Sequence, residues 1–351
     1  KNKIDTFNIS YENKEFDESL YAKKISKHLN TNHHDIRFDQ MNAKEILPDL
    51  AKIYCEPFAD KSQLPMIFLS KYTSNFKKVV LSGDGADELF AGYNRHINAK
   101  KILLLNKFLP LPIRKNLSVI SNENIQLLFK ILSNINLIGK NYQKTLSDNQ
   151  INKIKSVMTS NNLEDYYFKT IVNNDYSLMK NKYNNNFKLI EKTDSLDKYN
   201  LNKLINYDYL FYLPNDVLHK VDRASMFSSI ESRAPFLNLD IKNFANSLKE
   251  NQLIDKNKGK IILRKILNRY IPKQLIERPK MGFDIPLSQW SQNELKYLFL
   301  DYLNSKKIFD YIDINKSEMK NLIVNFQNNK HENFNRIWNL TSIQIWFETY
   351  F

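Results

Sequence analysis

The stretch Lys78–Tyr93, KVVLSGDGADELFAGY, decides the fold and directs the search for a function. Its first four residues are mostly apolar and predict a short strand that ends in the loop Ser82–Glu88. Two of the six glycines in the chain lie in this loop, where the backbone must turn tightly or approach a ligand closely. A helix is expected to begin at Ala86 or Asp87, directly after the loop.

A strand, a glycine-containing loop and a helix, in this order, present free backbone N–H groups to an anion. Asp84, Asp87 and Glu88 in the same loop would repel a bare phosphate. A hard divalent cation such as Mg²⁺ resolves this conflict, because it takes carboxylate oxygens on one side and phosphate oxygens on the other. The loop therefore predicts a metal-bridged polyphosphate. The alternative is an ordinary Gly-Asp-Gly turn followed by acidic residues that suit the helix dipole.

The residues before this stretch alternate between strand-like and helix-like patterns. Strands are expected over Ile4–Ile9 and His33–Phe38, and helices over Asp17–Leu29, Ala43–Tyr54 and Leu64–Tyr72. Such alternation indicates parallel βα units, so the fold class is α/β with a partial doubly wound parallel sheet. Ligands of such sheets bind at the carboxyl ends of the strands, where the loop after Leu81 lies.

Strand signals fade after Tyr93, and the rest of the chain has mainly helical patterns broken by Asn- and Lys-rich segments. We therefore expect residues 1–96 to form an α/β nucleotide-binding part. Residues 97–351 are expected to form a mainly helical part of the same domain.

The composition describes a folded, basic protein. Lys and Arg outnumber Asp and Glu by 52 to 38, which gives a net charge of +14. Only nine of the basic residues are arginine, the residue that bidentate phosphate and base recognition prefers, so we expect a solvated lysine surface and no nucleic-acid partner. Cys55 has no second cysteine to pair with, and no apolar run approaches about 18 residues. We therefore expect a cytoplasmic protein that does not enter the membrane.

Four segments, in order, resemble the synthetase domain of the glutamine-hydrolysing asparagine synthetases. The first is SGDGADELFAGYNR, which begins at Ser82 and looks like the signature of that family. The other three are Glu56–Pro65 (EPFADKSQLP), Leu218–Leu237 (LHKVDRASMFSSIESRAPFL) and Arg278–Trp290 (RPKMGFDIPLSQW). The resemblance implies a fold of the PP-loop ATP pyrophosphatase type, of which this chain would hold a partial doubly wound sheet followed by mainly helical segments.

The same resemblance implies an activity and its small-molecule partners. Family enzymes use ATP and Mg²⁺ to adenylate the side-chain carboxylate of aspartate, and ammonia derived from glutamine then displaces AMP to give asparagine. Two other interpretations stay open. One is a related amidotransferase that acts on another carboxylate, such as a sugar acid of a surface polysaccharide. The other is an inactive remnant that still binds a nucleotide.

Site residues follow from the resemblance position by position. Asp84 is implied to be an acid–base or substrate-orienting group, Asp87 a Mg²⁺ ligand, and Tyr93 a neighbour of the reacting carboxylate. The residues implied to hold ATP or pyrophosphate are Ser82, Gly83, Gly85 and Ile9. Those implied to face the nucleotide or the acyl acceptor are Asp60, Lys61 and Ser62.

A cation is also implied to stabilise the adenylation transition state. Some family members have a lysine where this chain has Arg223, and Lys220 lies one helical turn earlier. Residues three apart share a helix face, so either cation could reach the same phosphate, and we favour Lys220. Lys280 is a second candidate for a pyrophosphate contact.

One family element is missing from residues 1–351. The family carries a Ser-Gly-Gly-x-Asp-Ser loop, which grips pyrophosphate, after its first strand, and no such loop occurs in this sequence. We expect that loop, and an N-terminal glutaminase domain, to lie upstream of Lys1. The 351-residue piece alone is then expected to be inactive. A homodimer is one expectation for the assembly.

Overall fold

The computed structural model describes residues 3–127, 148–171, 199–277, 283–305, 307–329 and 334–351. Its regular elements, in chain order, are β1 (Asp5–Ser10), α1 (Ser19–Leu29), β2 (Asn32–Arg37), α2 (Gln40–Ile46), η1 (Leu47–Asp49), α3 (Leu50–Tyr54), α4 (Gln63–Thr73), β3 (Val79–Leu81), α5 (Ala86–Leu89), α6 (Asn94–Phe108), α7 (Leu111–Val119), α9 (Asp148–Met158), α10 (Leu163–Ile171), α11 (Leu201–Tyr207), the π-helix η3 (Asp208–Leu218), α12 (His219–Phe227), β4 (Glu231–Arg233), η4 (Pro235–Leu237), α13 (Leu239–Ser247), α14 (Glu250–Leu253), α15 (Ile261–Leu267), α16 (Lys273–Ile276), α17 (Leu287–Gln292), α18 (Lys296–Asn304), α19 (Ile308–Tyr311), α20 (Lys316–Gln327) and α21 (Phe334–Tyr350).

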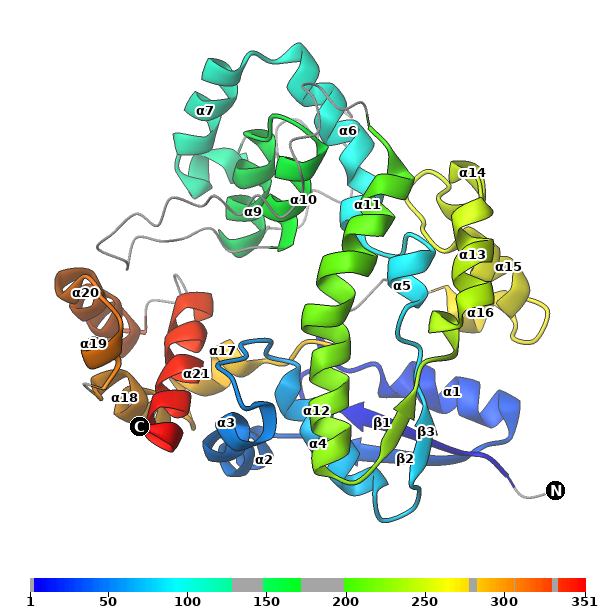
Figure 1. Cartoon of the computed structure of the whole chain (residues 1–351), viewed down its shortest axis with the longest axis horizontal. Helices are drawn as coiled ribbons and strands as arrows, with labels where there is room; N and C mark the ends of the chain where they lie inside the picture. Colours follow the sequence, from blue (N-terminus) through cyan, green and yellow to red (C-terminus); the bar gives the residue numbers. More distant parts are fainter. Residues whose placement is uncertain (1–2, 128–147, 172–198, 278–282, 306, 330–333) are drawn as a thin grey trace.

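The described strands form two small parallel sheets, which confirms the α/β class (Figure 1). In one sheet β1 runs beside β2, from the pair Asp5 and Asn32 to the pair Ser10 and Arg37. In the other, β3 pairs with β4. The sequence did not predict β4, which lies in the part expected to be helical. Its three residues are too short to show a strand pattern, and β4 is a strand because β3 lies beside it.

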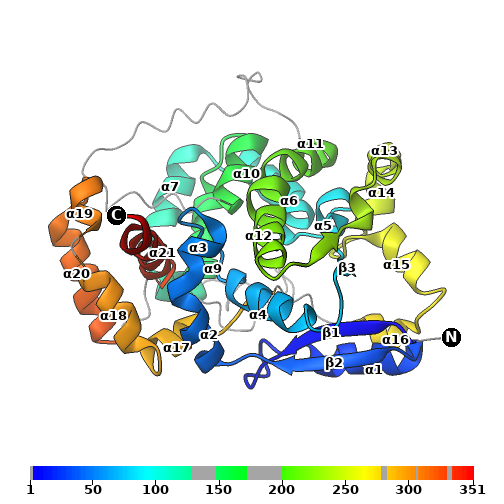
Figure 2. The same cartoon turned by 60° about the horizontal axis from the view of Figure 1, so that its bottom comes forward.

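Helices cover both faces of the β1–β2 sheet, as expected for parallel βα units (Figure 2). Side chains alternate along a strand, so Phe7 and its neighbours point to opposite faces. Phe7 stacks on His34 and contacts Phe76 just beyond α4, with ring centroids 4.8 and 5.8 Å apart. Thr6 and Asn8 border a cavity lined by α1 residues on the opposite side. Helix α4 also packs against α12, and this contact brings Glu56–Pro65 and Leu218–Leu237 together.

The helix expected over Ala43–Tyr54 is interrupted. Asp39 caps α2 by accepting hydrogen bonds from the backbone N–H groups of Met41 and Asn42. Pro48 then stands near the start of the 3₁₀ turn η1, after which α3 begins at Leu50. The prediction of one continuous helix was wrong here, because proline has no N–H to continue the hydrogen-bond ladder.

The largest core cluster joins the N-terminal helices to the C-terminal ones. Helix α21 packs on α3 and α18, and Trp338 is almost completely buried between them. The indole Nε1 of Trp338 donates a hydrogen bond to the Ala59 carbonyl at 2.6 Å. The C-terminal helices therefore hold the backbone of the segment that carries Asp60, Lys61 and Ser62.

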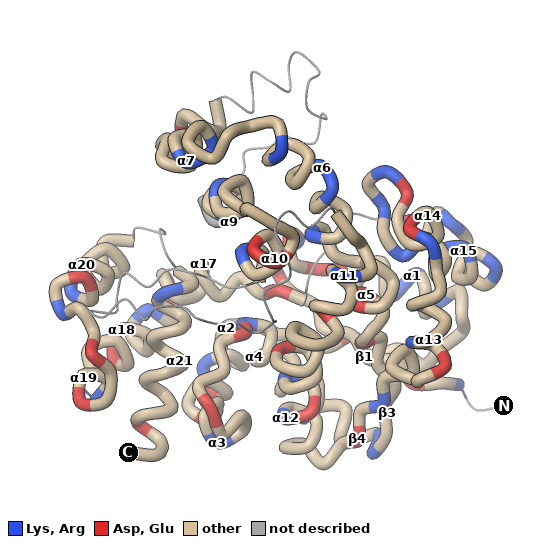
Figure 3. Tube along the Cα trace, turned by 45° about the horizontal axis from the view of Figure 1, so that its top comes forward, with Lys and Arg blue, Asp and Glu red and all other residues tan. Residues whose placement is uncertain are grey.

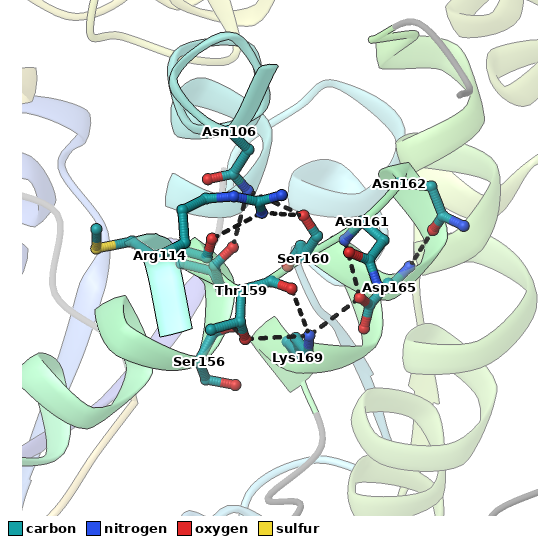
Figure 4. A network of polar contacts seen from close by, with 11 residues as sticks. Asn106, Arg114, Ser156, Thr159, Ser160, Asn161, Asn162, Asp165 and Lys169 are labelled. Carbon is teal, nitrogen blue, oxygen red and sulfur yellow. Dashed lines mark hydrogen bonds and ion pairs between the residues drawn. The ribbon is translucent and has the colours of Figure 1, made fainter. Parts of the chain in front are cut away.

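A second group of helices lies beside the helices of this core cluster and consists of α6, α7, α9 and α10. There the free carbonyls at the end of α9 receive side-chain donors (Figure 4). Arg114 donates to the carbonyls of Met158 and Ser160, at 3.0 and 2.7 Å, and Asn106 donates to those of Val157 and Ser160, both at 3.2 Å. These contacts satisfy a helix end that would otherwise bury unpaired acceptors.

Charged residues are distributed over many described elements (Figure 3). Lys and Arg, drawn in blue, occur for example around α6, α7 and α15. Among the described helices, none has both the length and the apolar character needed to cross a membrane.

Candidate functional site

The loop Ser82–Glu88 is held by a backbone hydrogen bond at Ser82 and by a side chain that packs on Gly85. The Ser82 N–H donates to the Arg233 carbonyl at 2.9 Å, which extends the β3–β4 pairing by one residue. Gly85 is buried against Leu237 of η4, and α5 begins at Ala86 as predicted. The segment that resembles the family signature, which begins at Ser82, is therefore adjacent in space to the segment Leu218–Leu237.

A cavity of about 440 Å³ lies between this loop and α12. Ser82 and Asp84 line it on one side, and His219, Asp222 and Ser225 line it on the other. The buried hydroxyl of Ser82 has no hydrogen-bond partner among the described residues. Asp84 is half-buried and, within the same part of the chain, has no ion-pair or hydrogen-bond partner. As far as the structure describes the chain, the cavity therefore combines an unpaired hydroxyl with an unpaired carboxylate.

Asp87, the residue implied to bind Mg²⁺, is held by a residue that the sequence analysis missed. The ammonium of Lys260 lies 3.0 Å from its Oδ1, and both side chains are about 29% exposed. Lys260 reaches this place because its backbone N–H donates to the Phe90 carbonyl, with Gly259 packed on Ala91. Lys260 thus brings a positive charge to the carboxylate from a segment about 170 residues away.

Gly92 sets the place of the Asp87 carboxylate. A Cβ atom at Gly92 would lie 1.7 Å from Oδ1 and 2.9 Å from Cα of Asp87, so any side chain must displace it. We expect Gly92→Ala to lower the free energy of unfolding by about 1–3 kcal/mol, because overpacking forces the backbone to shift. Urea denaturation measures this change.

Gly83→Ala is the matched control for Gly92→Ala. Nothing lies within 4 Å of a Cβ atom at Gly83, so its replacement should change the free energy of unfolding by no more than about 0.5 kcal/mol. Equal losses from both substitutions would contradict the role given to Gly92.

Tyr93 follows α5 and hydrogen-bonds back to it. Its hydroxyl donates to Glu88 Oε1 at 2.5 Å. Glu88 is 2% exposed, and this burial raises its pKa, although the Tyr93 hydrogen bond opposes the shift. The guanidinium of Arg95 lies over the Tyr93 ring at 3.9 Å and over the Tyr212 ring at 4.5 Å. These contacts fix the orientation of Tyr93 at the edge of the site.

Arg95 is itself neutralised by Asp208, which is completely buried. Its Nη2 and Nε donate to Asp208 Oδ1 at 2.6 and 3.0 Å, and the Tyr167 hydroxyl donates to the same oxygen at 2.9 Å. His96 Nε2 lies 2.6 Å from the second oxygen. Burial would raise the pKa of Asp208, but His96 and Arg95 outweigh it and hold the pKa below its usual value.

Asp60, Ser62 and Lys220, predicted from two separate segments, meet where α4 packs on α12. The Ser62 N–H and hydroxyl donate to Asp60 Oδ1 at 2.9 and 2.8 Å, and Lys220 Nζ donates to Asp60 Oδ2 at 2.6 Å. Burial would raise the pKa of Asp60, but Lys220 and the Ser62 hydrogen bonds lower it overall. Asp216, which the sequence analysis also missed, lies 3.8 Å from Lys220 Nζ.

The remaining predicted residues have different environments. Lys220 is buried, whereas Arg223 on the same helix is exposed, so the two cations do not share surroundings. Lys61 Nζ is 3.9 Å from Asp284, and the Ile9 side chain is in the core, which leaves its backbone as the accessible part. Lys280 lies outside the described residues.

Within the described residues, no three His, Cys, Asp or Glu side chains are grouped closely enough to hold a metal ion. Of the three loop carboxylates, Asp87 alone forms an ion pair with a described cation, which is Lys260. This arrangement fits Mg²⁺ held through a nucleotide, because Mg²⁺ commonly binds one or two protein carboxylates and takes its other ligands from phosphate and water.

The three residues that the sequence analysis missed carry little signal of their own. Lys260 belongs to the charged run KNKGK, which is typical of a solvated loop, and Asp216 and Asp208 lie in a mixed helical segment. Gly259 is one of only six glycines in the chain, but its presence alone does not identify Ala91 as the residue that it packs on.

Comparison with known proteins places these features in context. The model of the family described as asparagine synthase matches residues 1–348. Asparagine synthetase (glutamine-hydrolyzing) 1 of Bacillus subtilis (strain 168) is 24% identical over 98% of the chain and 52% of its own length. A putative asparagine synthetase of Mycobacterium bovis is 24% identical over 97% of the chain and 50% of its own length.

A shorter match is more similar. Putative asparagine synthetase (glutamine-hydrolyzing) 2 of Methanocaldococcus jannaschii is 39% identical over 34% of the chain and 25% of its own length. The chain spans about half the length of the two relatives that cover it almost completely.

Proposed function

The chain belongs to the asparagine synthase family, and on that premise we propose that it forms the ATP-using part of a carbon–nitrogen ligase that converts aspartate to asparagine. The observation that carries the proposal is the cavity directly after β3, where the Ser82 hydroxyl and the Asp84 carboxylate have no partner among the described residues. The carboxyl end of a parallel strand is the place where such folds bind ligands. A free carboxylate there can orient a substrate or accept a proton.

The proposed reaction proceeds in two balanced steps. A side-chain oxygen of aspartate attacks the α-phosphorus of ATP, so a C–O–P bond forms and pyrophosphate leaves as β-aspartyl-AMP is made. Ammonia, supplied from glutamine, then attacks the acyl carbon, a C–N bond forms, and AMP leaves. The nitrogen loses a proton in this step, and we assign its acceptance to Asp84. Ser82 and the backbone of Gly83 and Gly85 are assigned to the nucleotide.

Asp87 and Lys260 are assigned to the pyrophosphate end. Mg²⁺, when bound, would neutralise phosphate charge, and Asp87 would supply one carboxylate oxygen to hold it. Lys260 would then contact the phosphates instead of Asp87, because a divalent cation at the Asp87 carboxylate would repel the ammonium. The acceptor side of the site is assigned to Asp60, Lys61 and Ser62. Lys220 is assigned the role of holding Asp60 through their ion pair.

The test is an assay of AMP, pyrophosphate and amide product from ATP, Mg²⁺, ammonium and aspartate. It compares the 351-residue chain with the same chain extended through whatever its gene encodes before Lys1. We expect the extended protein to form asparagine and AMP in equal amounts. Mass spectrometry with aspartate or a uronic acid as acceptor identifies the product, and amidation of the sugar acid alone would replace aspartate as the proposed substrate.

The 351-residue chain alone is expected to form no AMP above background. It contains no Ser-Gly-Gly-x-Asp-Ser loop, and β1 and β3 each pair with one strand among the described residues. Turnover by this chain at the rate of the extended protein would contradict the expectation while supporting the proposed reaction.

A further inference from the structure

The helix formed by η3 and α12 presents one continuous polar face. Asp208, Tyr212, Asp216 and Lys220 follow one another at intervals of four residues. The first half, η3, is a π-helix with Pro214 inside it. Wide helical turns of this kind occur often at functional sites. The spacing places an acid–base pair, Asp216 and Lys220, one helical turn beyond the Tyr212 ring that contacts Arg95.

Two carboxyl groups compete for one ammonium on this face. Lys220 Nζ is 2.6 Å from Asp60 Oδ2 and 3.8 Å from Asp216 Oδ1. Asp60 also accepts two hydrogen bonds from Ser62, so its ionised form is well satisfied. Asp216 lies farther from the ammonium than Asp60 does and has no such hydrogen bonds from Ser62. Its Oδ1 is buried without a hydrogen-bond partner among the described residues. One proton on the Asp216 carboxyl would relieve the repulsion between the two acids.

The groups that face Asp216 come from three helices and from the segment before α4. They are Asp60 before α4, Lys220 of α12, Tyr212 of η3 and Arg95 of α6. Lys220 is engaged by Asp60, and Arg95 is engaged by Asp208, so neither cation is available to neutralise Asp216 fully. Burial and the Asp60 carboxylate together raise the pKa of Asp216 to about 7, although Lys220 opposes the shift.

We propose that Asp216 is a positioning residue that shares one proton with Asp60 across the Lys220 ammonium. The protonated cluster is electrically neutral, with one carboxylate, one carboxylic acid and one ammonium. Loss of the shared proton leaves the cluster with a charge of −1 and draws Lys220 between two carboxylates.

This charge matters for the acceptor, and that consequence rests on the proposed function. An acceptor that carries a carboxylate is repelled by a cluster with a charge of −1 and not by a neutral one. The shared proton would therefore set the pH range in which the acceptor side of the site is open to an anion. The proton sharing itself is independent of any turnover.

The test is a titration of the 351-residue chain labelled with ¹³C at the aspartate side-chain carboxyl, followed by NMR. We expect one aspartate resonance with a midpoint near pH 7, far above the ordinary value of 3.8. Asp216→Asn should remove this resonance. Asp222→Asn, which removes an exposed aspartate from the same helix, should leave it in place.

Asp60→Asn distinguishes a shared proton from simple burial. It removes the competing carboxylate and frees Lys220, so the midpoint of Asp216 should fall by more than about one pH unit. An unchanged midpoint in Asp60→Asn would overturn the proposal, as would a wild-type titration in which every aspartate has a midpoint below about 5. The titration needs no substrate, so it can succeed even if the ligase assay shows that aspartate is not the acceptor.

Discussion

Replacing Asp84 by asparagine is expected to lower the rate of amide formation about 10²–10⁴-fold, the usual contribution of a positioned acid or base. Asp84 lines the cavity beside Ser82 and has no partner among the described residues, so its carboxylate is available to a substrate. Asparagine keeps the size and removes the charge. Because no described contact is lost, the free energy of unfolding should change by no more than about 0.5 kcal/mol.

The measurement is the rate of AMP and asparagine formation by the extended protein, together with urea denaturation. Asp222→Asn is the matched control, since it removes a carboxylate from the opposite wall of the same cavity. Its effect on the rate should be much smaller. Equal losses from Asp84→Asn and Asp222→Asn would show that the cavity needs negative charge in general and would remove the specific role of Asp84.

Asp208→Ala is expected to cost about 3–5 kcal/mol of the free energy of unfolding, the largest stability effect that the structure predicts. The carboxylate is completely buried and pairs with Arg95, His96 and Tyr167. Its removal leaves the guanidinium buried without a counter-ion beside the rings of Tyr93 and Tyr212. Urea denaturation at neutral pH measures the loss.

Two further variants provide a scale for the loss in the free energy of unfolding caused by Asp208→Ala. Tyr167→Phe removes one of the hydrogen bonds and should cost about 1 kcal/mol. Asp301→Ala removes an exposed aspartate of α18 and should change the free energy of unfolding by no more than about 0.5 kcal/mol. A loss below about 1 kcal/mol in Asp208→Ala would show that the Arg95 network is not held by this carboxylate.

The pH dependence of the Asp208→Ala effect has a definite sign. The folded state holds the pKa of Asp208 below its ordinary value, so the unfolded chain binds the proton more tightly. The stabilisation from Asp208 is then fully present above about pH 4 and is lost as the pH falls through the lower, folded-state pKa. The difference in stability between the wild-type protein and Asp208→Ala should therefore shrink in acid.

The fold was predictable where the signal is local. The strands near Ile4–Ile9, His33–Phe38 and Lys78–Leu81, and the helix near Leu64–Tyr72, depend on apolar patterns that a short segment displays by itself. The break at Pro48 and the strand β4 were not found. The first is a single residue inside a helix-like pattern, and the second is a strand only because β3 pairs with it.

Some residues of the candidate site were likewise predictable from the sequence, and others were not. The loop chemistry picked out Asp84 and Asp87, and the resemblance added Asp60, Ser62 and Lys220, which the structure brings into contact. Lys260 was not found, because nothing near it in the sequence reveals that Gly259 packs on Ala91 and delivers its ammonium to Asp87.

The sequence by itself determined the α/β class, the glycine loop that ends β3, and membership of the asparagine synthase family. These properties depend on residue types and on spacing along the chain. Only the tertiary structure decided which charges neutralise one another: Lys260 with Asp87, Lys220 with Asp60, and Arg95 with Asp208. Charge pairing depends on distances of a few ångströms between residues more than 100 positions apart, and chain folding sets those distances.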